Sequence, residues 1–309
     1  MSLKFIWSCL TLVLLLGGLV LLATGQEKSR SAWTWQHSDD GWRREVKIEG
    51  RAAFNEEYTD VERLDADSAV RVEERRDGEV RRYEVRRGAD DTLSRTYTVN
   101  GEPRAIDAEA RRWIAGMLLV AVRRGGLDAS ARVALLLRQR GPDGVLSEVS
   151  QIEGDYARRV YYDLLLKTAN LSPAVLEKAL RQVGREIASD YERAQLLQHV
   201  ADTYLRADAL VPVFFETLDR ISSDYERRRV MTGFVGRAQL SQAARRRLLQ
   251  SAAALSSDYE KATLLIAAAP AYLDDASLRA AYEEAINTIG SDHERGRVRN
   301  ALAKRTTMN

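Results

Sequence analysis

The feature that most constrains this chain is a short string that returns at a nearly constant interval. Ser-Asp-Tyr-Glu followed by Arg or Lys begins at Ser189, Ser223 and Ser257, and a version with His in place of Tyr begins at Ser291. A weaker copy, Gly-Asp-Tyr-Ala-Arg, begins at Gly154. The five aspartates, Asp155, Asp190, Asp224, Asp258 and Asp292, lie 35, 34, 34 and 34 residues apart. An active-site motif normally occurs once, whereas this period is typical of two-helix units stacked into a solenoid.

The rest of each unit has the periodicity of two helices, each with one apolar face. Six, seven, ten and eleven residues after the aspartate, the first four copies carry Tyr161, Tyr162, Leu165 and Leu166; Leu196, Leu197, Val200 and Ala201; Val230, Met231, Phe234 and Val235; and Leu264, Leu265, Ala268 and Ala269. Before the aspartates, apolar pairs seven positions apart share one face: Val145 and Ile152, Leu180 and Ile187, Phe214 and Ile221, Leu248 and Leu255, Tyr282 and Ile289. In the last copy Arg299 replaces an apolar residue, as expected where a terminal repeat faces water.

The string itself has the composition of a helix start. Each serine can accept a hydrogen bond from an unpaired backbone N–H, and the glutamate three residues later completes a capping box. The predicted capping residues are Ser189 with Glu192, Ser223 with Glu226, Ser257 with Glu260, and Ser291 with Glu294. The aspartate between them falls in the first turn, where the helix dipole favours negative charge. Gly154 and Ala157 replace serine and glutamate in the first copy, so we expect a weaker cap there.

Two further positions of the string recur. A ring follows each aspartate, at Tyr156, Tyr191, Tyr225, Tyr259 and His293, and we expect these rings to stack between neighbouring repeats. A ladder of cations comes just after the box, at Arg158, Arg193, Arg227, Lys261 and Arg295. The ladder has two interpretations: ion pairs with carboxylates of neighbouring units, or a ridge that binds an acidic peptide or an anionic polymer.

Residues 27–104 have the pattern of an antiparallel β domain. Apolar and charged residues alternate over 44–50, 68–75, 80–87 and 93–99, which predicts four to six strands with one solvated face. Turn signals at 76–79 and 100–103 punctuate them. Arginines and glutamates interleave over 71–87, so cross-strand ion pairs explain this run better than a nucleic-acid site. An anion-binding patch is the alternative.

Residues 105–126 predict a helix that connects the sheet to the repeats. The segment has an acidic start, an apolar face through Trp113 and Met117, and a Gly-Gly stop at Gly126. It is too short and too charged to span a membrane. About five 34-residue helix pairs then fill 127–309, so the expected fold class is α+β, with an N-terminal membrane helix, a small antiparallel sheet and an α-solenoid.

Residues 1–26 indicate a signal anchor or a signal peptide. No charged residue follows Lys4 until Glu27, and apolar residues 5–23 would span about 28 Å as a helix, close to the thickness of a hydrocarbon core. Small residues at 23–25 offer a cleavage site, so both alternatives stay open. The predicted location is the bacterial inner membrane with the bulk in the periplasm, or the periplasm itself after cleavage. Cys9, the only cysteine, lies in this segment, so no thiol is exported.

The sequence has no recognisable catalytic or cofactor motif. His293 and Glu294 begin a His-Glu-x-x-His pattern, but Arg297 stands where a zinc site needs its second histidine. His37 and His199 are far apart, and we expect His199 to be partly exposed packing. Nucleophile-elbow, phosphate-loop and dinucleotide-binding sequences are absent. We therefore predict a non-enzymatic protein without catalytic residues, metal, cofactor or nucleic-acid partner.

The combination of a membrane segment, a strand-rich region and Ser-Asp-Tyr-Glu-Arg/Lys helical repeats resembles a group of uncharacterised bacterial envelope proteins. Similar repeats accompany membrane metallopeptidases of the β-lactam-sensing antirepressor type. The resemblance covers residues 33–309, and its specific part is the string at Ser189, Ser223, Ser257 and Ser291. The peptidase portion is missing here, so its activity is not transferred. The resemblance implies an exported region for sensing or docking.

Two functions follow from these patterns. The first is a membrane-tethered, periplasmic interaction or scaffold module whose repeats bind a protein partner, because solenoids supply extended surfaces. The second is an envelope sensor that holds a small ligand or a cell-wall fragment between the sheet and the first repeat. The second function predicts a closed pocket with converging polar groups at the junction over Trp113 to Gly126. An enzyme would instead require clustered titratable residues in one cleft.

Overall fold

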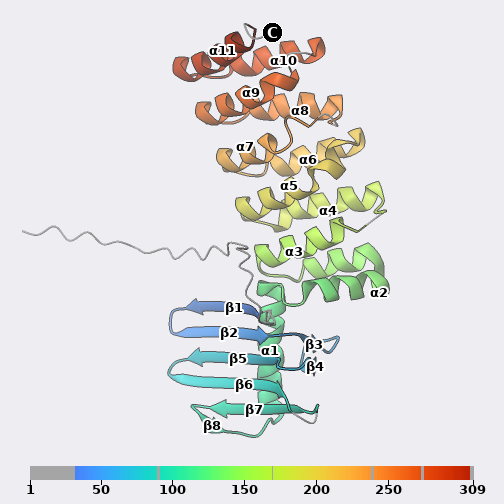
Figure 1. Cartoon of the computed structure of the whole chain (residues 1–309), viewed down its shortest axis with the longest axis vertical. Helices are drawn as coiled ribbons and strands as arrows, with labels where there is room; N and C mark the ends of the chain where they lie inside the picture. The colour runs from blue at the N-terminus through green and yellow to red at the C-terminus, as the bar shows by residue number, and fades with distance from the viewer. Residues whose placement is uncertain (1–31, 89–90, 169, 238–239, 273–274, 307–309) are drawn as a thin grey trace, which may run out of the picture.

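The computed structural model describes residues 32–88, 91–168, 170–237, 240–272 and 275–306. Strands at one end are followed by a long stack of helices, so the molecule is elongated (Figure 1). This arrangement confirms the α+β class. The predicted membrane segment 5–23 lies outside the described residues. Within the described ranges, no helix has the length and apolar character that crossing a membrane requires.

The β region is built around one antiparallel sheet of six strands. Its strands are β1 (Ala32–Asp39), β2 (Trp42–Glu49), β5 (Ala69–Arg76), β6 (Glu79–Arg87), β7 (Leu93–Val99) and β8 (Glu102–Pro103), in that spatial order. The four predicted strands correspond to β2, β5, β6 and β7, and β1 and β8 extend the sheet on either side. A separate two-stranded sheet, β3 (Ala52–Phe54) and β4 (Val61–Leu64), lies beside it.

One face of the six-stranded sheet is solvated, as the alternation predicted. Arginines and glutamates pair across strands on this face, for example Arg71 with Glu84 and Arg82 with Glu73. Burial alone would raise the pKa of Glu73, but hydrogen bonds from Arg82 and Arg75 outweigh it and lower this pKa. The basic run is therefore a network of ion pairs, which confirms the interpretation based on interleaved charges.

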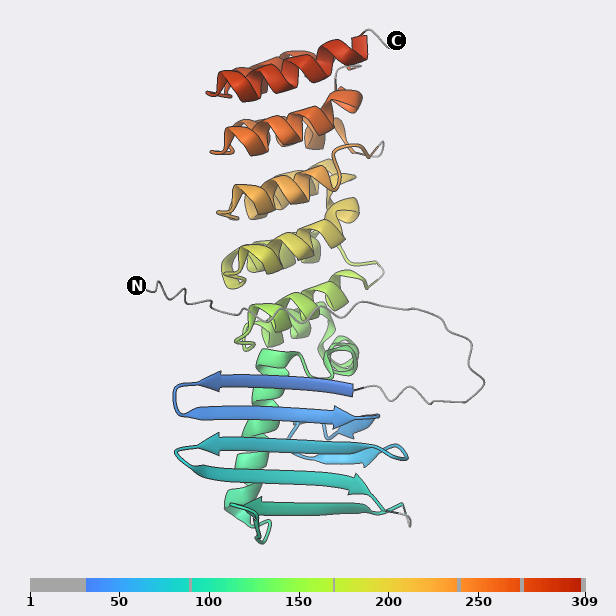
Figure 2. The same cartoon turned by 60° about the vertical axis from the view of Figure 1, so that its left-hand side comes forward.

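Helix α1 (Ala108–Gly125) covers the opposite face and crosses the strands (Figure 2). Its ends form as the sequence predicts, because the Asp107 side chain accepts a hydrogen bond from the backbone N–H of Ala110 and Gly126 adopts left-handed φ of 69°. Ile114, Met117, Leu118 and Val122 of α1 pack with Val46, Val70, Val72, Tyr83 and Val85 of the sheet into one core.

The repeat domain follows as two columns of helices. The helices that begin at the repeated string are α3 (Asp155–Leu166), α5 (Asp190–Leu205), α7 (Asp224–Thr232), α9 (Asp258–Tyr272) and α11 (Asp292–Thr306). Between them come α4 (Pro173–Glu186), α6 (Val211–Leu218) preceded by the short 3₁₀ helix η1 (Asp208–Leu210), α8 (Gln242–Ala253) and α10 (Ala276–Asn287). Each column packs helix on helix along the long axis of the molecule (Figure 1).

Helix α2 (Ala129–Val149) precedes the first string and is broken in its middle. Gly141 has non-helical φ of 64°, and the second half starts at Pro142 and supplies the helix predicted before Asp155. The apolar positions predicted in both helices of the units are buried, from Val145 at 0 % exposed to Leu166 at 9 %. Arg299 in α11 is exposed, as expected for the terminal unit.

Candidate functional site

The serine half of the predicted caps is present in every copy that has a serine. The hydroxyls of Ser189, Ser223, Ser257 and Ser291 each accept a hydrogen bond of 3.3 Å from the backbone N–H of the glutamate three residues later. The glutamate half differs from the prediction. The serine N–H donates instead to the aspartate of the preceding repeat, which leaves Glu192, Glu226, Glu260 and Glu294 free to bind arginines.

These aspartates link each repeat to the next one. Oδ2 of Asp155 accepts hydrogen bonds from the backbone N–H groups of Ala188 and Ser189, at 2.9 and 2.7 Å. Asp190 and Asp224 make the same bonds at the two following corners, where a corner is the turn that leads into the helix of the next string. At the last corner, backbone hydrogen bonds from Ser291 and then Gly290 lower the pKa of Asp258. The sequence indicated only a dipole interaction for this position, because its partners lie more than thirty residues away.

The first corner is held by α1 rather than by a repeat. The backbone N–H groups of Glu153 and Gly154 both donate to the carbonyl of Arg123, at 3.2 Å each, so the end of α1 does what an aspartate does elsewhere. Gly154 lacks a side-chain cap, as predicted. A Cβ at this position would lie 2.9 Å from the carbonyl oxygen of Arg124, so no serine fits here. The β region and the repeats are therefore joined by direct backbone contacts.

The cation ladder does not form the exposed ridge that one interpretation of the sequence required. The side chains of Arg158, Arg193, Arg227, Lys261 and Arg295 are 20, 7, 11, 9 and 31 % exposed. Three of them donate to backbone carbonyls at the end of the following helix: Arg158 to Glu186, Arg193 to Arg220 and Lys261 to Thr288. Cations stabilise helix C-termini because unpaired carbonyls carry partial negative charge. These three cations therefore tie the two helices of a unit together, whereas Arg227 pairs with Asp219 and Asp224, and Arg295 with Asp292.

The ring positions lie on the surface instead of between repeats, which corrects the predicted stacking. Tyr156, Tyr191, Tyr225 and Tyr259, here called the tyrosine row, are 52, 53, 53 and 55 % exposed. Among the described residues, these four are the large apolar side chains that remain exposed. Their rings make no aromatic contact with one another in the described part of the chain. His293 occupies the same position in the last unit, with its side chain 81 % exposed.

An arginine guanidinium packs against each ring of the tyrosine row. Arg159 and Arg228 lie 5.2 and 5.0 Å from the rings of Tyr156 and Tyr225 in their own repeats. Arg229 and Arg297 reach back from the next repeat to Tyr191 and Tyr259, at 5.6 and 5.2 Å. Each of these arginines is paired with one of the glutamates of the string: Arg159 with Glu192, Arg228 with Glu260, Arg229 with Glu226 and Arg297 with Glu294. The glutamates thus fix a surface of tyrosine and arginine that the sequence did not predict.

The His199 side chain is partly exposed, as predicted, and its Nδ1 also lies 3.0 Å from Oδ2 of buried Asp163. Arg159 also donates to Asp163, so this pair belongs to the network beneath the tyrosine row. His37 lies in β1 and stacks near Trp35 and Trp42. In the part of the chain that the structure describes, no three His, Cys, Asp or Glu side chains converge as a metal site would require.

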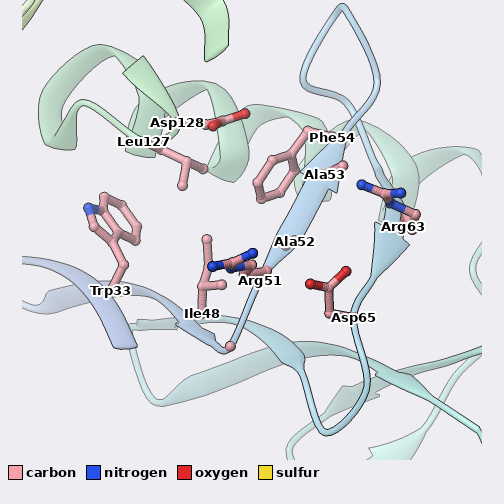
Figure 3. Close-up of a pocket in the computed structure, with 11 residues that line it drawn as sticks. Trp33, Ile48, Arg51, Ala52, Ala53, Phe54, Arg63, Asp65, Leu127 and Asp128 are labelled. Carbon is pink, nitrogen blue, oxygen red and sulfur yellow. The ribbon is translucent and has the colours of Figure 1, made fainter. Parts of the chain in front are cut away.

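The junction between the sheet and the repeats contains a pocket of about 400 Å³ (Figure 3). Trp33 of β1 and Phe54 of β3 line it from two sides, with Leu127 and Asp128 above them and Ile48 below. Arg51, Arg63 and Asp65 complete the lining from β3, β4 and their flanks. No residue from Trp113 to Gly126 lines this pocket, so it lies beside the junction that the sequence predicted for a ligand rather than within it.

Comparison with known proteins does not assign this chain to any group: no family model, no curated protein and no solved structure matches it. The resemblance to envelope proteins with similar repeats stays a prediction.

Proposed function

We propose that this protein is a non-enzymatic interaction module whose repeats present the tyrosine row to a protein partner. The observation that supports this most is exposure that the fold does not require. The apolar positions that build the stack are buried, whereas Tyr191 and Tyr225 remain 53 % exposed at a fixed place in each repeat. Tyrosine and arginine are the residue types that most often dominate binding energy at protein interfaces. Here arginines pack against the rings and limit their motion.

The spacing of the row favours an extended segment as the occupant. Packed helices lie about 8–10 Å apart, and α3, α5, α7 and α9 pack each on the next. Consecutive tyrosines therefore recur at about this distance. A polyproline II helix has three residues per turn and a rise of about 3.1 Å per residue, hence about 9.3 Å per turn. Every third residue of such a segment meets one tyrosine, and such segments commonly bind aromatic surfaces. A proline-containing extended segment of a partner protein is the proposed ligand.

The test compares two fluorescent peptides with the full chain in detergent micelles. One peptide has proline at every third residue, and the other has the same composition with proline at every fourth. Fluorescence anisotropy should show tighter binding of the first peptide. The double variant Tyr191→Ser and Tyr225→Ser should weaken this binding at least tenfold, since an interface tyrosine commonly contributes about 2 kcal/mol or more.

The matched control is Gln250→Ser, an exposed substitution on α8 in the other column of helices. It should leave binding unchanged, and circular dichroism should show that all variants keep their helix content and melting temperature. Equal binding of the two peptides would refute the spacing argument. Wild-type affinity in the double tyrosine variant would refute the role of the row.

We also propose that the module is exported and is held at the membrane by residues 5–23, or released into the periplasm if residues 1–26 are removed. The support is the apolar run without charge after Lys4 and the absence of cysteine after Cys9. Fusion of alkaline phosphatase, which is active only outside the cytoplasm, after Asn309 should give an active enzyme. Activity from a cytoplasmic reporter at the same position would contradict export.

A further inference from the structure

The junction pocket contains two arginines that differ from their neighbours. Ten arginines in the described part of residues 32–103 pair with a carboxylate: Arg43, Arg44, Arg71, Arg75, Arg76, Arg81, Arg82, Arg86, Arg87 and Arg95. Arg51 and Arg63, the remaining two, have no carboxylate within ion-pair distance in this region, and both line the pocket. Because an arginine fork is suited to bind a carboxylate through two parallel hydrogen bonds, these two side chains are available for an anionic group.

One part of the pocket lining is apolar and is held in place. Ile48 and Leu127 are 6 and 2 % exposed, and the Phe54 ring stacks on Tyr58 with 5.6 Å between centroids. Figure 3 shows the indole of Trp33 and the ring of Phe54 on either side of the space between Leu127 and Ile48. A volume of about 400 Å³ is within the range of small-ligand sites, which are mostly apolar with a few placed polar groups.

Carboxylates occupy the same pocket and set its charge. Asp65 lines it and forms no ion pair in the described structure. Asp128 lines it from the opposite side, where its Oδ2 accepts a hydrogen bond of 3.0 Å from the Tyr58 hydroxyl. Two cations and two anions give a pocket with mixed charge and no net excess. A dianion such as phosphate would be repelled by the aspartates, and an uncharged ligand would leave all four groups unused.

We propose that the junction pocket binds a small zwitterion with an apolar body, of the amino-acid or short-peptide class. Its carboxylate is bound by Arg51 and Arg63, its ammonium group by Asp65, and its side chain lies between Trp33 and Phe54, while Asp128 keeps its hydrogen bond from Tyr58. This site is separate from the tyrosine row and does not depend on the function proposed for the row. It lies where the sheet meets the start of α2, so a ligand in it contacts β3 and the residues that precede α2 together.

The test uses phenylalanine as the probe, with two derivatives that each lack one charge. N-acetyl-phenylalanine has no ammonium group, and phenylalanine amide has no carboxylate. Each is titrated into the full chain in detergent micelles and followed by calorimetry and by the indole resonance of Trp33, assigned from Trp33→Phe. Phenylalanine should shift this resonance, and each derivative should bind at least tenfold more weakly, because a charged hydrogen-bonded pair is lost.

Two variants separate the pocket from the rest of the surface. Arg51→Gln with Arg63→Gln should weaken phenylalanine at least tenfold while leaving the weak binding of the amide unchanged. Arg86→Gln, an arginine already paired with Glu84 on the solvated sheet face, should change neither. No shift of the Trp33 resonance at millimolar phenylalanine would overturn the proposal. Equal affinity for phenylalanine and its N-acetyl form would also overturn it, because Asp65 would then have no role.

Discussion

Replacement of Asp224 by alanine tests whether the aspartates join the repeats. Its Oδ2 accepts two hydrogen bonds of 2.7 Å from the backbone N–H groups of Ser256 and Ser257. A hydrogen bond to a charged acceptor contributes about 1.5–3 kcal/mol to stability, and these groups are partly solvated, so the lower value applies to each. The expected loss is about 3 kcal/mol.

The last aspartate provides an internal control. Asp292 has the same position in its helix, but no backbone N–H donates to its side chain in the described structure, and this side chain is 99 % exposed. It pairs only with Arg295 in the described structure, and an exposed pair contributes less than about 1 kcal/mol. Both substitutions remove the same favourable charge from a helix N-terminus, so this contribution cancels between them. Asp224→Ala should therefore destabilise the protein by about 2 kcal/mol more than Asp292→Ala.

Hydrogen exchange measured by mass spectrometry is the suitable assay, because repeat proteins unfold locally. The segment containing Ser256 and Ser257 should exchange about a hundredfold faster in Asp224→Ala, since each factor of ten corresponds to about 1.4 kcal/mol. Segments of the β region should keep their protection. If the two alanine variants lost the same stability, or if exchange at 256–257 were unchanged, the aspartate would be only a first-turn charge and our account of the string would fail.

Two further predictions follow from the same corners. Gly154→Ser restores the serine of the string in the first copy, yet it should lower the melting temperature. Contact with the Arg124 backbone costs about 1–3 kcal/mol, whereas a new cap contributes about 1 kcal/mol. A higher melting temperature would contradict this contact. Because backbone hydrogen bonds lower the folded-state pKa of Asp258, the stability that it contributes is present above its unfolded-state pKa of about 4 and is lost as pH falls through the lower folded value. Thermal unfolding between pH 6 and pH 2 should therefore show a loss that is smaller in Asp258→Asn, and identical pH profiles would exclude this contribution.

The sequence predicted those features that depend on neighbouring residues. The period of 34 residues, the buried faces and the serine caps follow from helix geometry, and all of them are present. The acceptor role of Asp155 cannot be predicted from neighbouring residues, because its partners Ala188 and Ser189 come close to it only when one repeat stacks on the next. The side to which the tyrosine rings point does not follow from the sequence for a related reason. An aromatic residue in the first turn can face a neighbour or solvent, and the packing angle between helices decides which.

Neither the lining of the pocket nor its exact place follows from the sequence. The sequence favours the junction over Trp113 to Gly126, whereas the lining comes from β1 to β4 and from Leu127 and Asp128, and Arg51 and Arg63 resemble the other arginines of a charge-rich region. Their difference is visible only in the pairing of the folded sheet, where the registers β2–β5 and β5–β6 bring Arg44 to Glu74 and Arg82 to Glu73. Strands β3 and β4 belong to a separate sheet and offer no such partners.

The five copies of the string allow an argument about the tyrosine row within one chain. Four of the five positions of the string have a task inside the fold: serine caps the helix, aspartate binds the start of the next repeat, glutamate binds an arginine, and in three copies the final cation reaches carbonyls of the following helix. In the first copy the serine and the glutamate of the string are replaced by smaller residues. Gly154 lies against the Arg124 backbone at the end of α1, and Ala157 is 0 % exposed, so neither position has room for the larger side chain. Tyr156 has no such contact and is still a tyrosine, as exposed as the other three. The ring of Tyr156 packs on Arg159 and is otherwise exposed, so its retention in this copy supports the binding role that we propose for the row.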